Sequence, residues 1–458
     1  MVAEQQQQAC YVLQAAKVDE APAQAAPKAA KVPTKAPGKK ATAPALTPQD
    51  LDRVILTQGF GWDSCEKNNW YETLKSQIPE LQKAGITHFW LPPPSQSVAH
   101  QGYLPGQLYN LNSKYGNREQ LVALNKALKA AGIVPVCDIV INHRCADQQD
   151  ESGVWNRFGD DVTHKGEKID WGAWAITGDD PDFKGTGNPD TGDDYGPAPD
   201  LDHTNKDLRT HIKEWLNWLK DDIGFEGWRF DFVKGYGPQF IKEYVMETVG
   251  AESYNVGEFW VDCRWNGSDL DHNQDPARQA LCDYLDGVGG AASLFDFPMK
   301  GILQEAVKNT QYWRLCDGAG KPPGLLGWWP TRATVFIKNH DTDSTQQHWP
   351  FPADKTETGY AYVLTHPGTP CIFYDDLWTD GDKLRELIAL RKRADITARS
   401  NVEIRVADAD LYLACIDKKV TVKLGPRYDL GDLLPKESEG WKVAVSGKDF
   451  CVWELASE

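Results

Sequence analysis

From residue 54 onward, short apolar runs rich in β-branched and aromatic residues alternate with amphipathic stretches of helical period. Alternation of this kind builds parallel strands that are joined by crossover helices. The helical stretches at 118–132 and 207–224 carry apolar residues at i, i+3 and i+4 spacing, and each ends at a glycine. The predicted strands are 54–60, 86–91, 133–142, 227–232, 255–260, 292–297, 334–339 and 370–374. Eight such units predict an α/β fold, a closed (β/α)8 TIM barrel.

Three segments depart from this alternation. Residues 144–203 are rich in Gly, Asp and Pro without a period, and a loop this long is normally functional or a small subdomain. Residues 397–458 alternate as short strands without helices, which predicts a C-terminal antiparallel β domain. Residues 1–50 form an extension whose Ala/Pro/Lys-rich tract predicts disorder. The barrel is therefore expected to comprise 51–143 and 204–396, with the loop domain inserted after its third strand.

Charge and apolar patterning exclude two kinds of partner. Acidic residues outnumber basic residues by 66 to 49, which gives a net charge of −17, so we expect no nucleic-acid partner. No stretch approaches the run of about 18 apolar residues that spans a bilayer, so we expect no membrane partner. The 18 Trp residues offer broad faces to sugar rings and favour a carbohydrate ligand, although such residues also fill cores.

The N-terminus and the cysteines bear on location. The N-terminal segment has neither a basic n-region nor an adequate apolar stretch, so secretion is not expected. The ten cysteines are scattered without a C-x-x-C motif or zinc-like spacing, and we interpret them as reduced thiols. We expect an intracellular monomer, with the cytoplasm favoured and a plastid as the alternative.

Ionisable residues gather at the ends of four predicted strands. In a barrel of this type the chemistry lies where strands end and the following loops begin. Each residue alone is explained as a strand cap or as half of a structural ion pair. Together, carboxylates at one end of apolar strands repel and lose hydration, unless a site uses that tension. The residues concerned are His143, Arg229, Asp231, Glu258, His340 and Asp341.

Four segments carry a family resemblance. DIVINH, GWRFDFVKG, GEFW and FIKNHD resemble, in order and spacing, the four signature regions of the α-amylase family of glycoside hydrolases. HPGTPCIFYDD, ADADLYLACID and LGPRYD are similar to plant-type members in particular, and the resemblance covers about 54–455. It implies endohydrolysis of internal α-1,4-glucosidic bonds in starch, glycogen-like glucans and malto-oligosaccharides by a retaining double displacement.

The resemblance also implies separate roles for the carboxylates. Asp231 would be the nucleophile, Glu258 the general acid/base and Asp341 the stabiliser of the transition state. Arg229 lies two residues before Asp231 and therefore on the same face of the strand, where it would keep that carboxylate ionised and oriented.

Further positions match substrate contacts of the family. His143 and His340 resemble the pair that hydrogen-bonds the reacting sugar, Tyr103 the aromatic that stacks on it, and Lys234 and Trp260 residues of the acceptor side. Simple packing is the alternative for the last three.

Trp328 and Trp329 are two adjacent large aromatics in a Gly/Pro context. Both can hardly be core residues of one strand or helix, and the pair resembles an exposed docking site for starch surfaces.

The aspartates of the long loop predict a cation, because they repel each other unless a hard ion such as Ca²⁺ is bound. By resemblance the main ligands are Asn142, Asp200 and the carbonyl of Gly235, with Asp179 and Asp194 as further ligands. The alternative is that these aspartates only form turns with their Gly and Pro neighbours.

Two other functions share these features. A transglycosylating or exo-acting member of the same family would carry all four signatures, and the early products from amylose would distinguish it. A catalytically silent glucan-binding protein typically lacks one of the three carboxylates, and none is missing here.

Overall fold

A computed structural model describes residues 48–379 and 381–456, so the predicted disordered extension lies almost wholly outside the described residues. The core of the fold is a closed barrel of eight parallel strands, each paired with its neighbours along the chain. These strands are β1 (Leu56–Gln58), β2 (His88–Leu91), β5 (Val134–Ile139), β8 (Gly227–Phe230), β9 (Asn255–Gly257), β12 (Ser293–Phe295), β13 (Ala333–Val335) and β14 (Thr369–Phe373). The TIM barrel that the sequence predicts is therefore confirmed.

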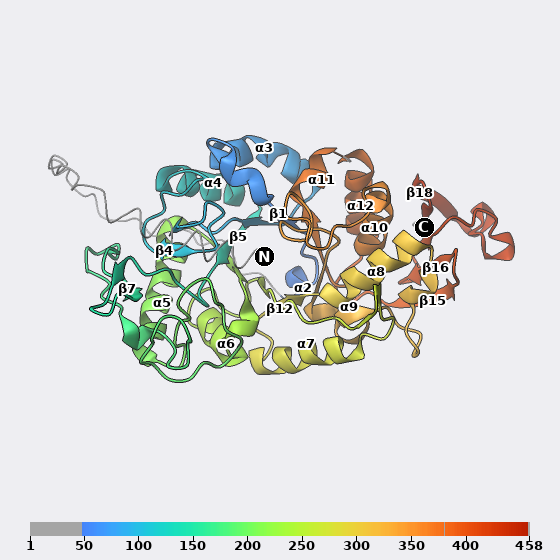
Figure 1. The fold of residues 1–458 in the computed structure, drawn as a ribbon. Coiled ribbons are helices and arrows are strands. Elements are labelled where there is room, and N and C mark those ends of the chain that lie inside the picture. The colour runs from blue at the N-terminus through green and yellow to red at the C-terminus, as the bar shows by residue number, and fades with distance from the viewer. Residues whose placement is uncertain (1–47, 380, 457–458) are drawn as a thin grey trace.

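Helices surround the barrel (Figure 1). They are α2 (Pro48–Leu51), α3 (Trp70–Ala84), α4 (Arg118–Ala130), α5 (Lys206–Trp218), α6 (Pro238–Met246), α7 (Asp275–Val288), α8 (Phe297–Asn309), α9 (Gly324–Trp328), α10 (Thr356–Thr365), α11 (Tyr374–Thr379) and α12 (Gly381–Arg393). Local signals set their ends: Asn117 and Gln120 form a capping box at the start of α4, and a π-helical turn after α5 ends at left-handed Gly224.

The barrel strands are shorter than the apolar runs that predict them. The third run, 133–142, forms a strand only as far as Ile139, and the first run, 54–60, only at Leu56–Gln58. Residues beyond each strand leave the ladder and turn into the loops above the barrel. This is the position at which barrel enzymes place their functional side chains.

Small hairpins decorate the loops. They pair β3 (Gln96–Ser97) with β4 (Pro105–Gln107), β6 (Gln148–Gln149) with β7 (Trp155–Arg157), and β10 (Trp265–Asn266) with β11 (Asp269–Leu270). The segment 144–203 contains only β6, β7 and one short 3-10 turn, and it lies beside α5 and α6 in Figure 1. It is the irregular insertion that the sequence predicts after the third barrel strand.

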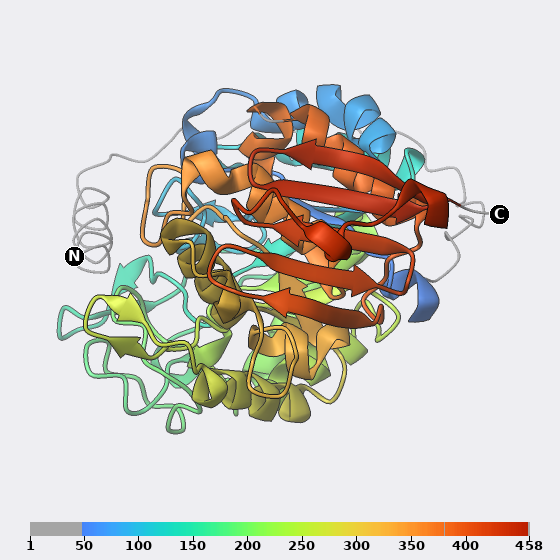
Figure 2. The ribbon, with the colours of Figure 1, turned by 90° about the vertical axis from the view of Figure 1, so that its right-hand side faces the viewer.

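A five-stranded antiparallel sheet follows the barrel, in the order β15, β16, β17, β19, β18. Its strands are β15 (Val402–Ala407), β16 (Tyr412–Ile416), β17 (Val420–Leu424), β18 (Trp441–Gly447) and β19 (Phe450–Leu455). Figure 2 shows this sheet face on, and it packs against α10 and α12 on the side of the barrel away from segment 144–203.

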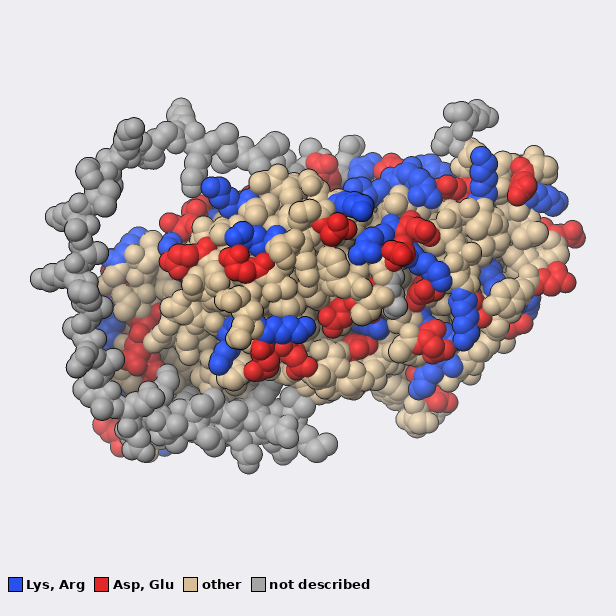
Figure 3. All heavy atoms as spheres, turned by 90° about the horizontal axis from the view of Figure 1, so that it is seen from above, with Lys and Arg blue, Asp and Glu red and all other residues tan. Residues whose placement is uncertain are grey.

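On the face shown in Figure 3, Lys and Arg side chains are interspersed with Asp and Glu, without a continuous basic track among the described residues. Within 48–379 and 381–456, no helix has both the length and the apolar character needed to cross a membrane.

Candidate active site

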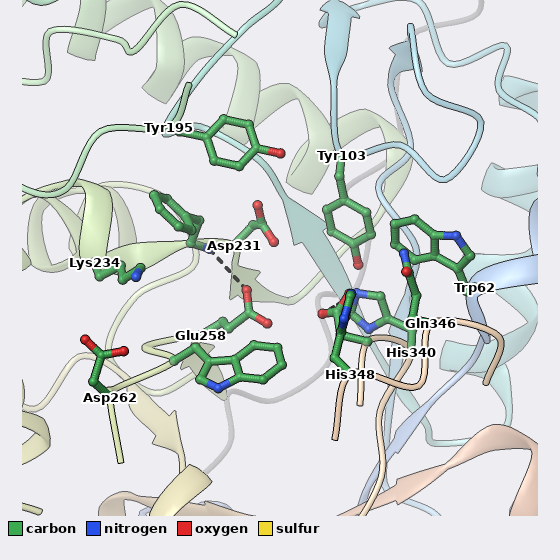
Figure 4. Close-up of a pocket in the computed structure, with 13 residues that line it drawn as sticks. Trp62, Tyr103, Tyr195, Asp231, Lys234, Glu258, Asp262, His340, Gln346 and His348 are labelled. Atoms are coloured by element: carbon green, nitrogen blue, oxygen red, sulfur yellow. Dashed lines mark hydrogen bonds and ion pairs between the residues drawn. The ribbon is translucent and has the colours of Figure 1, made fainter. Parts of the chain in front are cut away.

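A pocket of about 370 Å³ opens above the carboxyl ends of the barrel strands. It contains all three predicted catalytic carboxylates, Asp231, Glu258 and Asp341, which come from three different strand ends. Figure 4 shows Asp231 and Glu258 between a wall that carries Tyr103 and Trp62 and an opposite side that carries Tyr195 and Lys234. The complete lining is Trp62, Tyr103, Tyr195, Asp231, Phe232, Lys234, Glu258, Trp260, Asp262, His340, Asp341, Gln346 and His348.

Arg229 joins the carboxylates from below the pocket. Its Nη1 donates hydrogen bonds to Asp231 Oδ1 at 2.6 Å and to Asp138 Oδ1 at 2.9 Å, and its Nη2 forms an ion pair with Glu258 Oε1 at 2.9 Å. The barrel register explains this reach, because Arg229 lies opposite Asp138 on β5 and opposite Val256 on β9. The side chain is fully buried, so the contacts act in a medium of low polarity.

Burial sets the protonation of the carboxyl groups. It raises the pKa of Asp231 to about 6, against the opposing effect of Arg229. The pKa of Glu258 rises to about 7, because burial and the Asp231 charge together exceed the effect of Arg229. Burial and the Glu258 charge raise the pKa of Asp341 well above its usual value. The pocket thus holds an acid that keeps its proton near neutral pH beside a carboxyl that ionises more readily.

The backbone turns sharply after Asp231. Phe232 has a φ of 42°, a left-handed conformation that is uncommon for a bulky residue and that is found at functional sites. The turn directs the Phe232 N–H toward Glu258 Oε2 at 3.4 Å, the contact drawn in Figure 4. A strained turn therefore connects the two neighbouring strand ends that carry the acid and the nucleophile candidates.

An aromatic wall faces the carboxylates. The rings of Tyr103 and His340 stack at 5.1 Å and 9°, and the Trp62 ring lies parallel to Tyr103 at 6.1 Å and 3°. His340 Nε2 lies 3.2 Å from Asp341 Oδ2, while Gln58 Nε2 lies 2.8 Å from His340 Nδ1. Burial lowers the pKa of His340 well below its usual value, so the ring is neutral and can hydrogen-bond a hydroxyl.

Not every predicted substrate contact reaches this pocket. Tyr103, Lys234, Trp260 and His340 line it, and Arg229 lies beneath it. His143 is buried and does not line the pocket; it stacks on Tyr195 at 3.8 Å, and its Nε2 lies 2.8 Å from the Tyr103 carbonyl.

The predicted docking pair lies outside the pocket. Trp328 is 38% exposed and lies 4.1 Å from the Arg278 guanidinium, whereas Trp329 is half-buried and packs against the core. Only one ring of the pair is therefore exposed as predicted.

Several pocket residues were not found from the sequence. Tyr195, Gln346 and His348 lie in loops and Trp62 starts a short 3-10 helix, Trp62–Glu66, and periodicity gives no signal for either. Asp138 was visible as a charged residue in a buried strand. It accepts hydrogen bonds from Tyr103 Oη at 2.8 Å, Trp90 Nε1 at 3.0 Å and Arg229.

An acidic cluster lies beside the pocket, in the insertion. Carboxylate oxygens of Asp190, Asp194 and Asp200 lie within 4.8 Å of one another. Asn142 Nδ2 donates to Asp200 Oδ1 at 2.8 Å, which leaves the buried Asn142 Oδ1 without a hydrogen-bond partner among the described residues. A Cβ on Gly235 would lie 2.0 Å from that oxygen. This oxygen-rich set fits a hard divalent cation.

The predicted ligand set is therefore partly reproduced. Asn142, Asp194, Asp200 and Gly235 come together, and Asp190 joins them although the sequence did not single it out. Asp179 instead accepts a hydrogen bond from the Asp190 N–H at 2.8 Å.

Electrostatics at this cluster agree with a cation. Burial and the charges of Asp190, Asp180 and Asp194 raise the pKa of Asp200 to about 8. Carboxylates this close disfavour each other's ionisation, and a bound cation removes the conflict.

Fold and pocket together define a class of enzyme. Two neighbouring carboxyl groups of unequal pKa, at the mouth of a (β/α)8 barrel and against an aromatic wall, are the arrangement that hydrolyses glycosidic bonds. The molecule is a barrel glycoside hydrolase.

Comparison with known proteins makes this assignment specific. A family described as "Alpha amylase, catalytic domain" matches residues 71–247, and "Alpha-amylase C-terminal beta-sheet domain" matches 393–454. "Probable alpha-amylase 2" of Arabidopsis thaliana is 44% identical over 407 residues, which cover 88% of this chain and 94% of that protein. "Alpha-amylase 3, chloroplastic" of the same plant is also 44% identical, over 88% of this chain; the chain spans only 44% of that protein's length. The chain belongs to the α-amylase family of glycoside hydrolases.

Solved structures share the fold at lower identity. An Anoxybacillus α-amylase superposes with a TM-score of 0.60 at 15% identity and covers 89% of this chain and 99% of its own. CldA, titled a cyclomaltodextrin glucanotransferase, gives a TM-score of 0.63 at 17% identity over 88% of this chain and 99% of its own. These likenesses concern the fold alone.

Proposed function

We propose that this α-amylase hydrolyses internal α-1,4-glucosidic bonds of starch, glycogen-like glucans and malto-oligosaccharides with retention of configuration. The observation that carries the proposal is the unequal environment of two neighbouring carboxyl groups. The pKa of Glu258 is raised to about 7 and that of Asp231 to about 6, and Arg229 contacts both groups. A proton donor and an ionised nucleophile can then coexist near pH 6 to 7.

The mechanism has two displacements. In the first, Glu258 donates its proton to the glycosidic oxygen while an oxygen of Asp231 attacks the anomeric carbon, so the old C–O bond breaks and a glycosyl ester forms. In the second, the Glu258 carboxylate takes a proton from water, the hydroxyl bonds to the anomeric carbon and Asp231 leaves. Arg229 stabilises the Asp231 carboxylate before attack and again on departure.

Asp341 and the aromatic wall hold the reacting sugar. The Asp341 carboxyl lies beside His340, and both groups face the pocket that contains the nucleophile. We assign Asp341 to the hydroxyls of the distorted sugar, where its contacts strengthen as the ring flattens. Tyr103 stacks on the same sugar, and Lys234 and Trp260 contact the acceptor side.

We infer that the acidic cluster binds Ca²⁺, held by Asn142, Asp194, Asp200, Asp190 and the carbonyl of Gly235, with Asp179 as an outer contact. The bound ion would neutralise the cluster and fix the segment 144–203, which has few ladder hydrogen bonds of its own. The ion would have a structural role, because its candidate ligands lie beside the catalytic pocket and are not among the carboxylates that line it.

We also infer that Trp328 docks on starch surfaces outside the pocket, since it is partly exposed and its ring is fixed against Arg278. We further propose that the protein is an intracellular monomer, located in the cytoplasm or in a plastid. Cys137, Cys371 and Cys415 are free thiols, which suits a reducing compartment.

The mechanism is tested with amylose as substrate. Wild-type enzyme should release mixed short oligosaccharides early, and the reducing ends should appear as the α-anomer by NMR. Asp231→Asn and Glu258→Gln should each lower the rate at least about 10²-fold, whereas Asp170→Asn, an exposed site in the insertion, should not change it.

Other products would contradict either the endo-acting cleavage, the hydrolysis or the retention of configuration that we propose. A single early product indicates exo-action, transfer products indicate transglycosylation, and β-anomers exclude retention. Binding without hydrolysis by the wild type would indicate a silent glucan-binding protein.

A further inference from the structure

A second pocket, of about 330 Å³, lies at the opposite end of the barrel from the active site. It is formed where four consecutive barrel strands begin, since Asn255 starts β9, Ser293 starts β12, Arg332 precedes β13 and Thr369 starts β14. The catalytic carboxylates follow the other ends of these strands. A ligand in this second pocket therefore does not contact the groups that cleave the glucan.

Most polar groups in the walls of this pocket are satisfied by one another. Ser253 Oγ donates to the Gly250 carbonyl at 2.6 Å and accepts from Asn255 Nδ2 at 2.9 Å. The Tyr254 hydroxyl lies 2.8 Å from Thr334 Oγ1. These hydroxyl groups already have hydrogen-bond partners within the protein and do not require a ligand.

Arg332 is the exception. The side chain is half-buried, and its guanidinium has no hydrogen bond or ion pair with any residue of 48–379 or 381–456. A guanidinium has five N–H donors in a planar fork, and burying it without an acceptor is costly. Burial and the nearby charge of Arg399 lower the pKa of Arg332.

The backbone makes room for this guanidinium. Gly290 follows α7 with a φ of 84°, and a Cβ there would lie 3.0 Å from Arg332 Nη2. A side chain at Gly290 would therefore be strained and would crowd the arginine. The close approach places the guanidinium against the wall of the pocket, with its remaining donors free.

The charges around the pocket favour an anion. Arg399 also lines it and forms an ion pair with Asp52 at 2.7 Å, and Asp52 is the only carboxylate in the described lining. Two guanidinium groups therefore face one carboxylate, a local positive excess in a chain of net charge −17. Such an excess in a concave site attracts small anions.

We propose that this pocket binds a small oxyanion-bearing metabolite, a phosphate monoester or a carboxylate, through a bidentate contact with Arg332. Two oxygens of a carboxylate or of a phosphate group match the guanidinium fork, and the volume suits a small molecule. Because the site is remote from the carboxylates, its ligand acts as an effector or stabiliser and not as a substrate.

Calorimetric titration of the full-length enzyme tests the site. The probes are inorganic sulfate, which leaves calcium in solution, glucose 6-phosphate and malate. We expect millimolar or tighter binding of at least one probe, and the comparison of the phosphate ester with the dicarboxylate identifies the preferred class. Arg332→Gln should weaken this binding about tenfold or more, because a charge-assisted hydrogen-bond pair is lost. Arg332→Lys should retain part of it.

Two controls separate this site from nonspecific binding and from catalysis. Arg405→Gln, at an exposed ion pair of β15 with Glu403, should bind the probes as the wild type does. Arg332→Gln should hydrolyse starch at the wild-type rate, which shows that it has folded and that the active site is independent. Absence of binding by every probe, or equal binding by Arg332→Gln, would overturn the proposal whatever the hydrolysis assay shows.

Discussion

Gly235 and Asn142 lie so close together that a Cβ on the glycine would be 2.0 Å from the amide oxygen of Asn142. Gly235→Ala should therefore destabilise the fold by about 1–3 kcal/mol and weaken the response to calcium, because Asn142 must move. Thermal unfolding with and without added calcium measures both effects. Gly196→Ala, in the insertion that carries Asp194 and Asp200, is the control, since nothing lies within 4 Å of the Cβ position there. Equal melting temperatures for the two variants would contradict this reading of the site.

Calcium removal should lower the melting temperature of the wild type, because an ion that binds only the folded state stabilises it by mass action. Asp200→Asn and Asp190→Asn should melt lower in calcium and respond less to EDTA, since each removes a carboxylate from the cluster. Asp170→Asn, exposed in the same segment, should respond like the wild type. A wild-type melting temperature that EDTA leaves unchanged would rule out the calcium site.

Activity should depend on pH with a maximum between about 6 and 7. The acid limb follows Asp231, whose raised pKa of about 6 means that the nucleophile is lost to protonation as the pH falls below that value. The alkaline limb follows Glu258, which loses its proton above a pKa of about 7. The measurement is kcat/KM against pH on a soluble malto-oligosaccharide. Glu258→Gln should lack the alkaline limb in its residual activity, and a flat wild-type profile would disprove the assignment.

The raised pKa of Glu258 also predicts an effect on stability. A carboxyl whose pKa is higher in the folded than in the unfolded state favours folding at low pH, and this contribution disappears as the pH rises through about 7. Glu258→Gln removes the cost of the buried charge, so it should raise the melting temperature by about 1–3 °C at pH 8. Near pH 4 the two proteins should melt together. A variant that melts lower than the wild type at pH 8 would refute this.

Arg144 should be essential to the insertion. It is fully buried, forms an ion pair with Asp161 at 3.0 Å and lies 4.8 Å from the Trp171 ring. Arg144→Ala leaves the buried Asp161 carboxylate without its counter-ion and should cost about 3–5 kcal/mol in urea unfolding. Arg157→Ala, which breaks an exposed pair in the same segment, should cost about 1 kcal/mol or less. Similar losses for both variants would contradict a structural role for the buried pair.

The fold was predictable because its signal is repeated. Each barrel strand is an apolar run flanked by a helical pattern. If one of the eight units were misassigned, the other seven would still predict the barrel. Asp231, Glu258 and Asp341 followed from the same regularity, since strand ends in a barrel converge on one pocket. Their separate roles stay a proposal.

The remaining parts of the site lacked such a regular signal. Trp62 reaches the pocket from a single 3-10 turn and Tyr195 from an irregular loop, and Asp190 is one of many aspartates in a Gly-rich stretch. His143 directly follows Asn142, yet it packs behind Tyr195 instead of entering the pocket. Beyond the end of a strand, the direction in which a side chain points depends on the path of the loop. Neither the periodicity nor the composition of the sequence specifies that path.

Tyr195 belongs to both centres of the molecule. Its backbone N–H donates to Asp200 Oδ2 at 2.9 Å, and its ring lines the catalytic pocket. Loss of the proposed cation would therefore disturb a residue of the sugar site directly, before any strand of the barrel separates. An enzyme without the proposed calcium would then keep its fold but bind its glucan more weakly. The free calcium concentration around the enzyme would therefore limit the rate at which it hydrolyses starch.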